Sequence, residues 1–149
     1  MQTPPLTALA RLFESARLAG TARWWCLPAG LDLFRPGEPA AELHLLRAGR
    51  LGAFRVEAGE EPRFLGIVRP GEPAGEMSLI TGFAHSGRLT ALRDSEVLSL
   101  DREAFFSACA ADPDILTDLA RLRVGRARDA GRTAALVEPS VFGFVAQGP

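Results

Sequence analysis

Residues 75–91 read GEMSLITGFAHSGRLTA, and this stretch decides the fold and the site that we expect. Gly75 lets the backbone approach a ligand closely, and the carboxylate of Glu76 follows it directly. A bound phosphate needs backbone N–H groups at a helix N-terminus and a cation for its remaining charge. A ribose hydroxyl needs a fixed carboxylate acceptor. The alternative from chemistry alone is a plain turn in which Glu76 caps a short helix.

The segments around this stretch predict a mostly-β fold. Between residues 22 and 101, short runs of branched and aromatic residues alternate with turns that contain Gly and Pro. Many short strands with even turn spacing predict a sandwich or barrel-like roll, with a one- or two-turn helix inserted at Pro73–Thr81. The expected strands are Ala22–Leu27, Leu31–Arg35, Glu42–Arg47, Leu51–Glu57, Arg63–Val68, Arg88–Leu92 and Glu96–Asp101.

Three longer helices are expected at the two ends of the chain. Apolar residues at helical spacing predict a helix over residues 6–19 that ends near Gly20. Asp101 is placed to cap a second helix, with Leu100 and Phe105 as a hydrophobic staple around it. Asp112 and Pro113 begin a third helix, which we expect to end at about Ala130. We therefore divide the chain into a domain at 1–131 and a tail or linker to a following domain at 132–149.

Composition sets wider limits on the function. The 149 residues are enough for one domain, and a net charge of −1 gives no general attraction to nucleic acid or anionic lipid. All 17 basic residues are arginine, which excludes lysine chemistry. Cys26 and Cys109 lie in apolar sequence, so we expect buried, reduced thiols. With neither a signal peptide nor a membrane span in the sequence, the expected location is cytoplasmic, with membrane-peripheral association only through a parent protein.

The motifs together resemble one known family. GEMSLITG, a polar tract and RLTALRDSEVLSLDREAFFSACAADPDIL closely resemble the cyclic nucleotide-binding domain family, and PAGLDLFRPGEPAAELHLLRAGRLGAFR is similar to its early strands. The resemblance covers about residues 6–130. It implies an eight-stranded roll, a double-stranded β-helix of the jelly-roll kind, with one N-terminal helix and two C-terminal helices. It also implies a domain that senses cAMP or cGMP and relays the signal to an attached effector.

The family's phosphate cassette has Gly-Glu and then, after a few residues, Pro-Arg-Ala-Ala-Thr. Here Gly75 and Glu76 match its first two positions, and Ala84 stands in place of the proline. His85 stands at the phosphate-pairing arginine, Ser86 and Gly87 at the two alanines, and Arg88 at the threonine. The resemblance also implies that the last helix covers a bound purine, with plain packing as the alternative for its leucines. The implied ligand site is Gly75, Glu76, Met77, His85, Ser86 and Arg88, with Leu119 and Leu122 as lid residues.

The departure at His85 affects affinity most. An arginine is always charged and pairs with two phosphate oxygens, whereas a histidine at neutral pH is mostly neutral and offers one donor. Removing one partner of a buried charged pair costs about 3–5 kcal/mol. His85 could charge in the field of the phosphate, or Arg88 could supply the guanidinium if it points inward. Two alternatives stay open. In the first, the pocket still binds cAMP or cGMP; in the second, the pocket is degenerate or serves another purpose.

The effector is suggested by a second resemblance. GEMSLITG followed by HS and RLTALRDSE resembles the versions of this domain that are joined to patatin-like phospholipases of the neuropathy-target-esterase type. The sequence has no Gly-x-Ser-x-Gly elbow, so we expect no catalytic residue in this chain. Two alternatives are the sensor and dimerisation domain of a catabolite-activator-like transcription regulator, and a structural interaction domain without a ligand. A homodimer is compatible with any of these.

The remaining candidates have ordinary interpretations. His44 lies in a strand-like segment and is expected to be a satisfied core or surface histidine. Trp24 and Trp25 are expected to be one surface and one core residue. Two histidines and two distant cysteines lack the spacing of a metal site, and no cofactor is expected. The arginines of the last helix are interpreted as a solvated face, with a contact surface for anions as the alternative, namely Arg121, Arg123, Arg126, Arg128 and Arg132.

Overall fold

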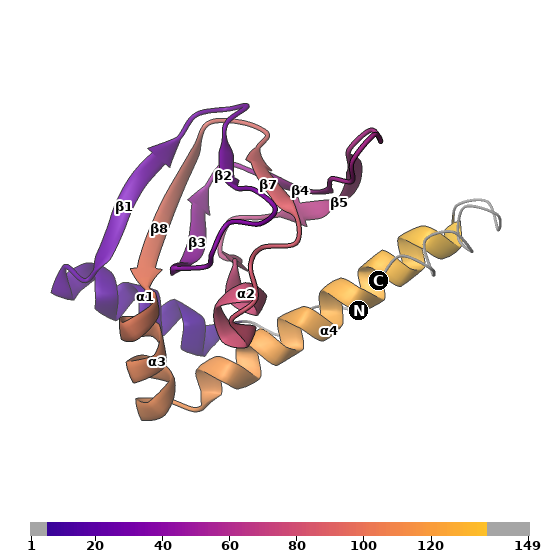
Figure 1. Cartoon of the computed structure of the whole chain (residues 1–149). Helices are drawn as coiled ribbons and strands as arrows, with labels where there is room; N and C mark the ends of the chain where they lie inside the picture. The colour runs from indigo at the N-terminus through magenta and orange to yellow at the C-terminus, as the bar shows by residue number, and fades with distance from the viewer. Residues whose placement is uncertain (1–5, 137–149) are drawn as a thin grey trace.

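The computed structural model describes residues 6–136, with side chains described as far as residue 128. Eight strands form two four-stranded antiparallel sheets that face each other as a roll (Figure 1). The first sheet has the order β1 (Ala22–Leu27), β8 (Ser95–Asp101), β3 (Glu42–Ala48) and β6 (Pro73–Ala74). The second has the order β2 (Asp32–Phe34), β7 (Arg88–Ala91), β4 (Leu51–Arg55) and β5 (Arg63–Val68). The expected fold class is confirmed.

The central strands of the first sheet divide the core into two parts. Side chains alternate between the two faces of a strand, so Leu98 and Leu100 of β8 face one way and Val97 and Ser99 the other. Leu98 and Leu100 pack in a cluster with the helices, whereas Val97 packs in the apolar interior of the roll. Strand β3 follows the same pattern, with Leu43 in the helix-covered cluster and Leu46 in the interior. The interior of the roll is therefore lined by one face of each sheet.

Two helices and the first turns of a third pack on the outer face of the first sheet. Helix α1 (Thr7–Ala19) precedes the roll, and α3 (Arg102–Ala111) and α4 (Asp114–Leu136) follow it (Figure 1). The predicted cap at Asp101 is confirmed, since its Oδ1 accepts from the backbone N–H of Ala104 at 2.8 Å. Phe105 is fully buried, as the predicted staple requires. The helix end expected at about Ala130 is wrong, because α4 continues through Gly131 to Leu136.

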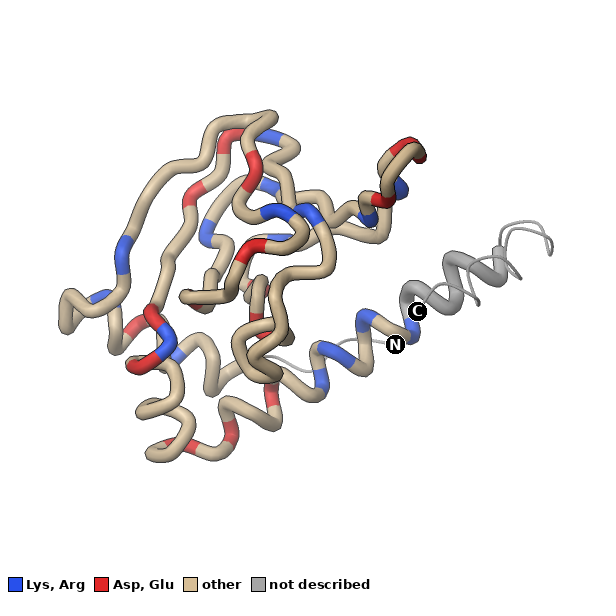
Figure 2. Tube along the Cα trace, in the orientation of Figure 1, with Lys and Arg blue, Asp and Glu red and all other residues tan. Residues whose placement is uncertain are grey.

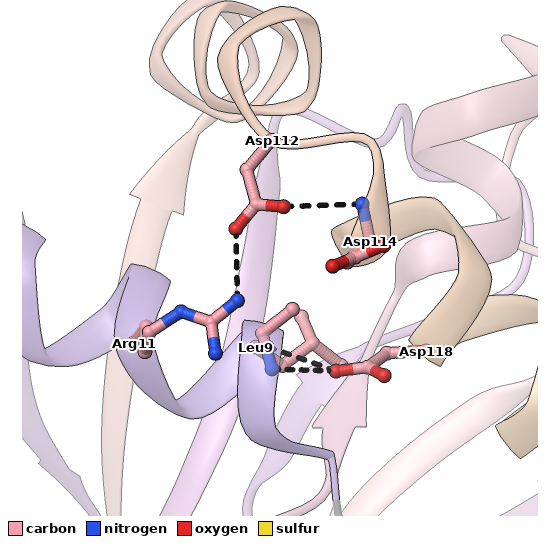
Figure 3. A network of polar contacts seen from close by, with 6 residues as sticks. Leu9, Arg11, Asp112, Asp114 and Asp118 are labelled. Carbon is pink, nitrogen blue, oxygen red and sulfur yellow. Dashed lines mark hydrogen bonds and ion pairs between the residues drawn. The ribbon is translucent and has the colours of Figure 1, made fainter.

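Helix α1 is capped from α4. Leu6 stands at its N-cap and offers no side-chain acceptor. Instead, Oδ2 of Asp118 accepts from the backbone N–H groups of Ala8 at 2.8 Å and Leu9 at 3.1 Å (Figure 3). Asp118 is only 4% exposed. An exposed ion pair between Arg11 and Asp112 at 3.2 Å lies beside it. The start of α4 is thus joined to the start of α1 by a buried carboxylate.

Several smaller expectations can be compared with the structure. The short helix is present as α2 (Glu76–Thr81), but the two-residue strand β6 before it was not expected. Cys109 is buried as expected, whereas Cys26 is exposed, because its side chain on β1 points away from the core. Trp24 is exposed and Trp25 is half-buried. The division at residues 131 and 132 lies within α4 and stays a prediction, and most of the proposed tail lies outside the described residues.

Candidate functional site

The site is built around the junction between β6 and α2. Gly75 makes this turn with a φ of +86°, in the left-handed region that residues other than glycine rarely adopt. A Cβ atom at this position would lie 3.5 Å from Cε1 of His85, 3.6 Å from Cδ2 of His44 and 3.5 Å from the carbonyl oxygen of Glu42. Gly75 therefore packs directly against both histidines of the chain, which lie 41 positions apart in the sequence.

Helix α2 turns Glu76 inward and Met77 outward. Glu76 is 4% exposed and Leu79 is fully buried, while Met77 is 39% exposed. The carbonyl oxygen of Leu79 accepts from Nη1 of Arg102 at 2.9 Å, so α3 holds the end of the short helix. The structure thus buries Glu76 beside Gly75 and leaves the side chain of Met77 exposed.

Glu76 is bound by an arginine of α4. Oε1 of Glu76 lies 2.8 Å from Nη1 of Arg126, whose Nη2 donates to the carbonyl oxygen of Pro73 at 2.8 Å. The Glu76 side chain is 6% exposed and that of Arg126 is 28% exposed. This pair is a charge-assisted contact in a site largely shielded from water, where such bonds are strong. It connects the carboxylate expected to bind ribose with the C-terminal helix.

Sequence reasoning missed this role of Arg126, which we had placed on the solvated face of the helix. Arg121, Arg123 and Arg128 are exposed as expected. Figure 2 shows basic positions spaced along α4. The buried residues Ile115, Leu119 and Leu122 mark the inner face of α4. Positions spaced by three or four residues share one face of a helix, so residue 126 is the next position on that face. Helical spacing was the signal that could have identified it.

His85 is buried and lies against an aromatic ring. Its imidazole stacks on Phe34 with ring centroids 3.7 Å apart and planes tilted by only 4°, and the residue is 6% exposed. Backbone bonds fix the loop, because the N–H of His85 donates to Glu38 and its carbonyl accepts from Gly37. Burial lowers the pKa of His85, with a smaller opposing effect of the Glu38 charge. The ring is therefore neutral at pH 7 in the absence of a ligand.

Arg88 does not join this group. Leu89 and Ala91 of β7 face the interior of the roll, so the alternation of the strand puts Arg88 on the outer face. Its guanidinium lies over the ring of Phe54 at 4.9 Å, and its Nε is 3.9 Å from Oδ1 of Asp32. The hypothesis that Arg88 replaces the missing phosphate arginine requires an inward side chain, and this arrangement is the opposite.

The other predicted residues divide between the surface and the core. Ser86 is exposed beside His85 at the edge of the site. Leu119 packs in the cluster that also contains Phe13 of α1 and Phe105 of α3, and Leu122 is equally buried. Packing, the alternative to a lid, therefore describes Leu119 in this conformation. Among the side chains that the structure describes, as far as residue 128, no group of three or more acidic, histidine or cysteine residues is arranged to hold a metal ion.

Comparison with known proteins identifies the class to which this geometry belongs. Residues 25–112 match the family model described as "Cyclic nucleotide-binding domain", and the chain belongs to this family. Its fold and the sequence match together define a regulatory domain of the cyclic nucleotide-binding type.

Particular relatives are similar over most of this chain. It is 34% identical over 103 residues to a protein from Thermus thermophilus named "Cyclic AMP receptor protein", covering 69% of this chain and 48% of that protein. It is 29% identical over 132 residues to an uncharacterized NTE family protein of Mycobacterium tuberculosis, covering 89% of this chain and 22% of that protein. The chain thus spans half or less of the length of these relatives.

A solved structure supports the fold. The regulator CLP of Xanthomonas campestris, described as c-di-GMP responsive, superposes with a TM-score of 0.73 and 26% identity, covering 85% of this chain and 63% of that chain.

Among the described residues, no helix is long and apolar enough to cross a membrane.

Proposed function

We propose that this chain is a sensor domain that binds a cyclic nucleotide, with cAMP and cGMP as the first candidates, and reports the occupied state through α4. The observation that carries the proposal is the contact between Glu76 and Arg126, at 2.8 Å. The carboxylate in the position for ribose is held by the helix that leads out of the domain. The name of the Thermus relative supports cAMP, and that of the Xanthomonas regulator supports a related cyclic phosphodiester.

The mechanism follows from the partners of Glu76. A ribose hydroxyl would donate to the Glu76 carboxylate, which already accepts from Arg126. The incoming hydroxyl either displaces Arg126 or shares the carboxylate with it, and in both cases the hold of the roll on α4 changes. Because Arg126 also donates to Pro73, the turn before Gly75 and the helix respond together. A ligand shifts a conformational equilibrium only if its affinities for the two states differ. Here the two states are those with and without the ion pair between Glu76 and Arg126, and a ribose hydroxyl at Glu76 would bind them differently.

The phosphate would lie at the Gly75 and His85 end of the site. Arg88 lies against Phe54 and Asp32 and not beside His85, so His85 binds as a neutral donor or charges when the phosphate arrives. The loss of a fixed cation predicts weaker binding than a site that holds arginine. Met77 would contribute through its backbone and Ser86 through its exposed hydroxyl.

We further propose that the attached effector is a patatin-like phospholipase. The similarity to the Mycobacterium NTE family protein, which extends over 89% of this chain, supports this choice. A transcription regulator of the catabolite-activator kind is the alternative, which the Thermus relative supports. The chain would then act in the cytoplasm, reach a membrane only through its parent protein, bind no nucleic acid itself, and could pair as a homodimer.

Calorimetric titration tests ligand binding. We expect heat from cAMP or cGMP, and much less from 5′-AMP, which lacks the cyclic phosphodiester. Glu76→Gln should weaken binding by about tenfold or more, since a bond to a charged group contributes about 1.5–3 kcal/mol. Glu103→Gln is the matched control, because Glu103 is exposed on α3. A wild-type protein that is silent at millimolar nucleotide would leave only a structural interaction domain.

A further inference from the structure

A row of polar side chains lies inside the roll, where the neighbouring residues are apolar. It consists of Trp25 on β1, Ser99 on β8 and His44 on β3, adjacent strands of the first sheet. Val97 and Leu46, two positions away from Ser99 and His44, face the same interior and are fully buried. Polar groups in such an interior are costly unless they are hydrogen-bonded. The row is therefore an exception that calls for a reason.

The hydrogen bonds of the row fix the proton on His44. The indole Nε1–H of Trp25 can only donate, and it donates to Oγ of Ser99 at 2.8 Å. Oγ of Ser99 also lies 2.7 Å from Nδ1 of His44. Among the described residues, the Ser99 hydroxyl has no other acceptor to which it donates, so its proton points to Nδ1. The proton of the neutral ring is then on Nε2, an assignment made from the hydrogen-bond network.

The ring carries its Nε2–H toward the cassette. Cδ2, the atom bonded to Nε2, lies 3.6 Å from the Cβ position of Gly75, and Cε1 of His85 lies 3.5 Å from the same point. His44 is only 8% exposed, yet no described residue accepts from its Nε2. Burial is the largest reason that the pKa of His44 is lowered to about 4, with smaller contributions from His85, once it is protonated, and Arg23, so the ring remains neutral at physiological pH. A fixed, unused donor therefore faces the turn that the ligand approaches.

We propose that His44 is a ligand-binding residue whose Nε2–H donates to an anionic oxygen of the ligand, beside His85, with Ser99 and Trp25 as positioning residues. The inference rests on the proposed function, since it assigns a new contact to the same site. Two neutral imidazole donors satisfy hydrogen bonds without adding positive charge. They suit a singly charged phosphodiester, because the second charge of a phosphomonoester would be buried without a counter-ion. The pair thus selects cyclic phosphodiesters by chemistry that an arginine does not provide.

The imidazole nitrogens can be observed directly, because the chain has only two histidines. We expect a long-range ¹H–¹⁵N spectrum of the free protein to show His44 with its proton on Nε2, assigned by the loss of the other ring's signals in His85→Gln. Saturating cAMP or cGMP should shift Nε2–H of His44 downfield. Ser99→Ala should weaken nucleotide binding. In the same variant, the proton of His44 should be distributed between Nδ1 and Nε2.

Substitutions at His44 separate binding from packing. His44→Leu should weaken nucleotide binding about tenfold or more. His44→Gln keeps an N–H donor near the position of Nε2 and should recover most of that loss. Recovery by glutamine would not follow from a purely structural role. Urea unfolding of each variant identifies any that fail to fold, in which case the spectrum of the wild-type protein decides.

The outcomes distinguish this inference from the proposed function. Suppose that nucleotide binds, but that the Nε2–H signal of His44 does not shift and that His44→Leu leaves the affinity unchanged. The inference about His44 is then wrong, and the proposed function stands. If no nucleotide binds, the function is wrong, and inorganic phosphate becomes the probe. A shift of the His44 Nε2–H signal on adding phosphate would then still support His44 as a donor to an anion. The absence of that shift would overturn both the inference about His44 and the proposed function.

Discussion

Asp118 provides the most quantitative test of how the helices are held. Its carboxylate accepts from two backbone N–H groups in the first turn of α1, at 2.8 and 3.1 Å, and these belong to Ala8 and Leu9, which are 2% and 0% exposed. The first four N–H groups of a helix have no partner within it. Asp118→Ala removes the charged acceptor of both groups, and we expect a loss of about 2–3 kcal/mol in the free energy of unfolding.

Asp118→Asn separates charge from hydrogen bonding. The amide oxygen can still accept, so only the attraction of the carboxylate to the helix N-terminus is lost, about 0.5–1 kcal/mol. Both variants are measured by urea unfolding, and a constant m-value shows that the two folded states are comparable. For a chain of this length, the alanine variant should also melt about 4–12 °C lower.

Arg11→Gln is the matched control at the same interface. It breaks the exposed ion pair with Asp112, which is 3.2 Å long, and should change stability by less than about 1 kcal/mol. If Asp118→Ala were no more destabilising than Arg11→Gln, the buried carboxylate would not hold α1 to α4, and the reasoning from burial and capping would be refuted.

Three further predictions concern single groups. Because burial lowers the pKa of His44 from 6.5 to about 4, the folded state resists protonation, so its contribution to stability is complete above pH 6.5 and is lost as pH falls toward 4. The free energies of unfolding of the wild type and His44→Gln should therefore converge by about 3 kcal/mol over that interval, and parallel curves would contradict this. Exposed Cys26 should react quickly with Ellman's reagent, and Cys109 slowly, since burial shields it and raises the pKa of its thiol; Cys26→Ser should remove the fast phase. Gly75→Ala should cost about 1–2 kcal/mol because of its φ of +86°, whereas Gly66→Ala, where a Cβ meets open space, should be nearly neutral in the same urea assay.

Local patterns in the sequence predicted most of the fold. Alternation and turn residues located seven of the eight strands. Asp101 was identified as a cap because it directly precedes the helix, and its carboxylate accepts from the N–H of Ala104, three residues further on. The strand Pro73–Ala74 was missed because two residues carry no alternation, and it exists only by pairing with β3. The end of α4 was misplaced because Gly131 was expected to stop a helix that continues to Leu136.

The site was less predictable because its contacts join distant parts of the chain. Gly75 and Glu76 were proposed from the family resemblance, since local chemistry alone left a plain turn as the alternative, and the partner of Glu76 is 50 positions away. Nothing adjacent to Arg126 distinguishes it from the exposed Arg123 and Arg128 except its position on the buried face of α4. His44 was interpreted as an ordinary strand residue, since its closeness to Gly75 depends on the pairing of β3 with β6.

Hydrogen exchange across α4 tests the central claim most directly. Amide exchange over residues 114–128 is measured in the wild type and in Arg126→Gln, each with and without saturating cyclic nucleotide. The account predicts that the nucleotide changes exchange in this helix of the wild type and has little effect on it in Arg126→Gln, which lacks the contact to Glu76. A nucleotide that binds tightly while α4 exchanges equally with and without it would contradict the account.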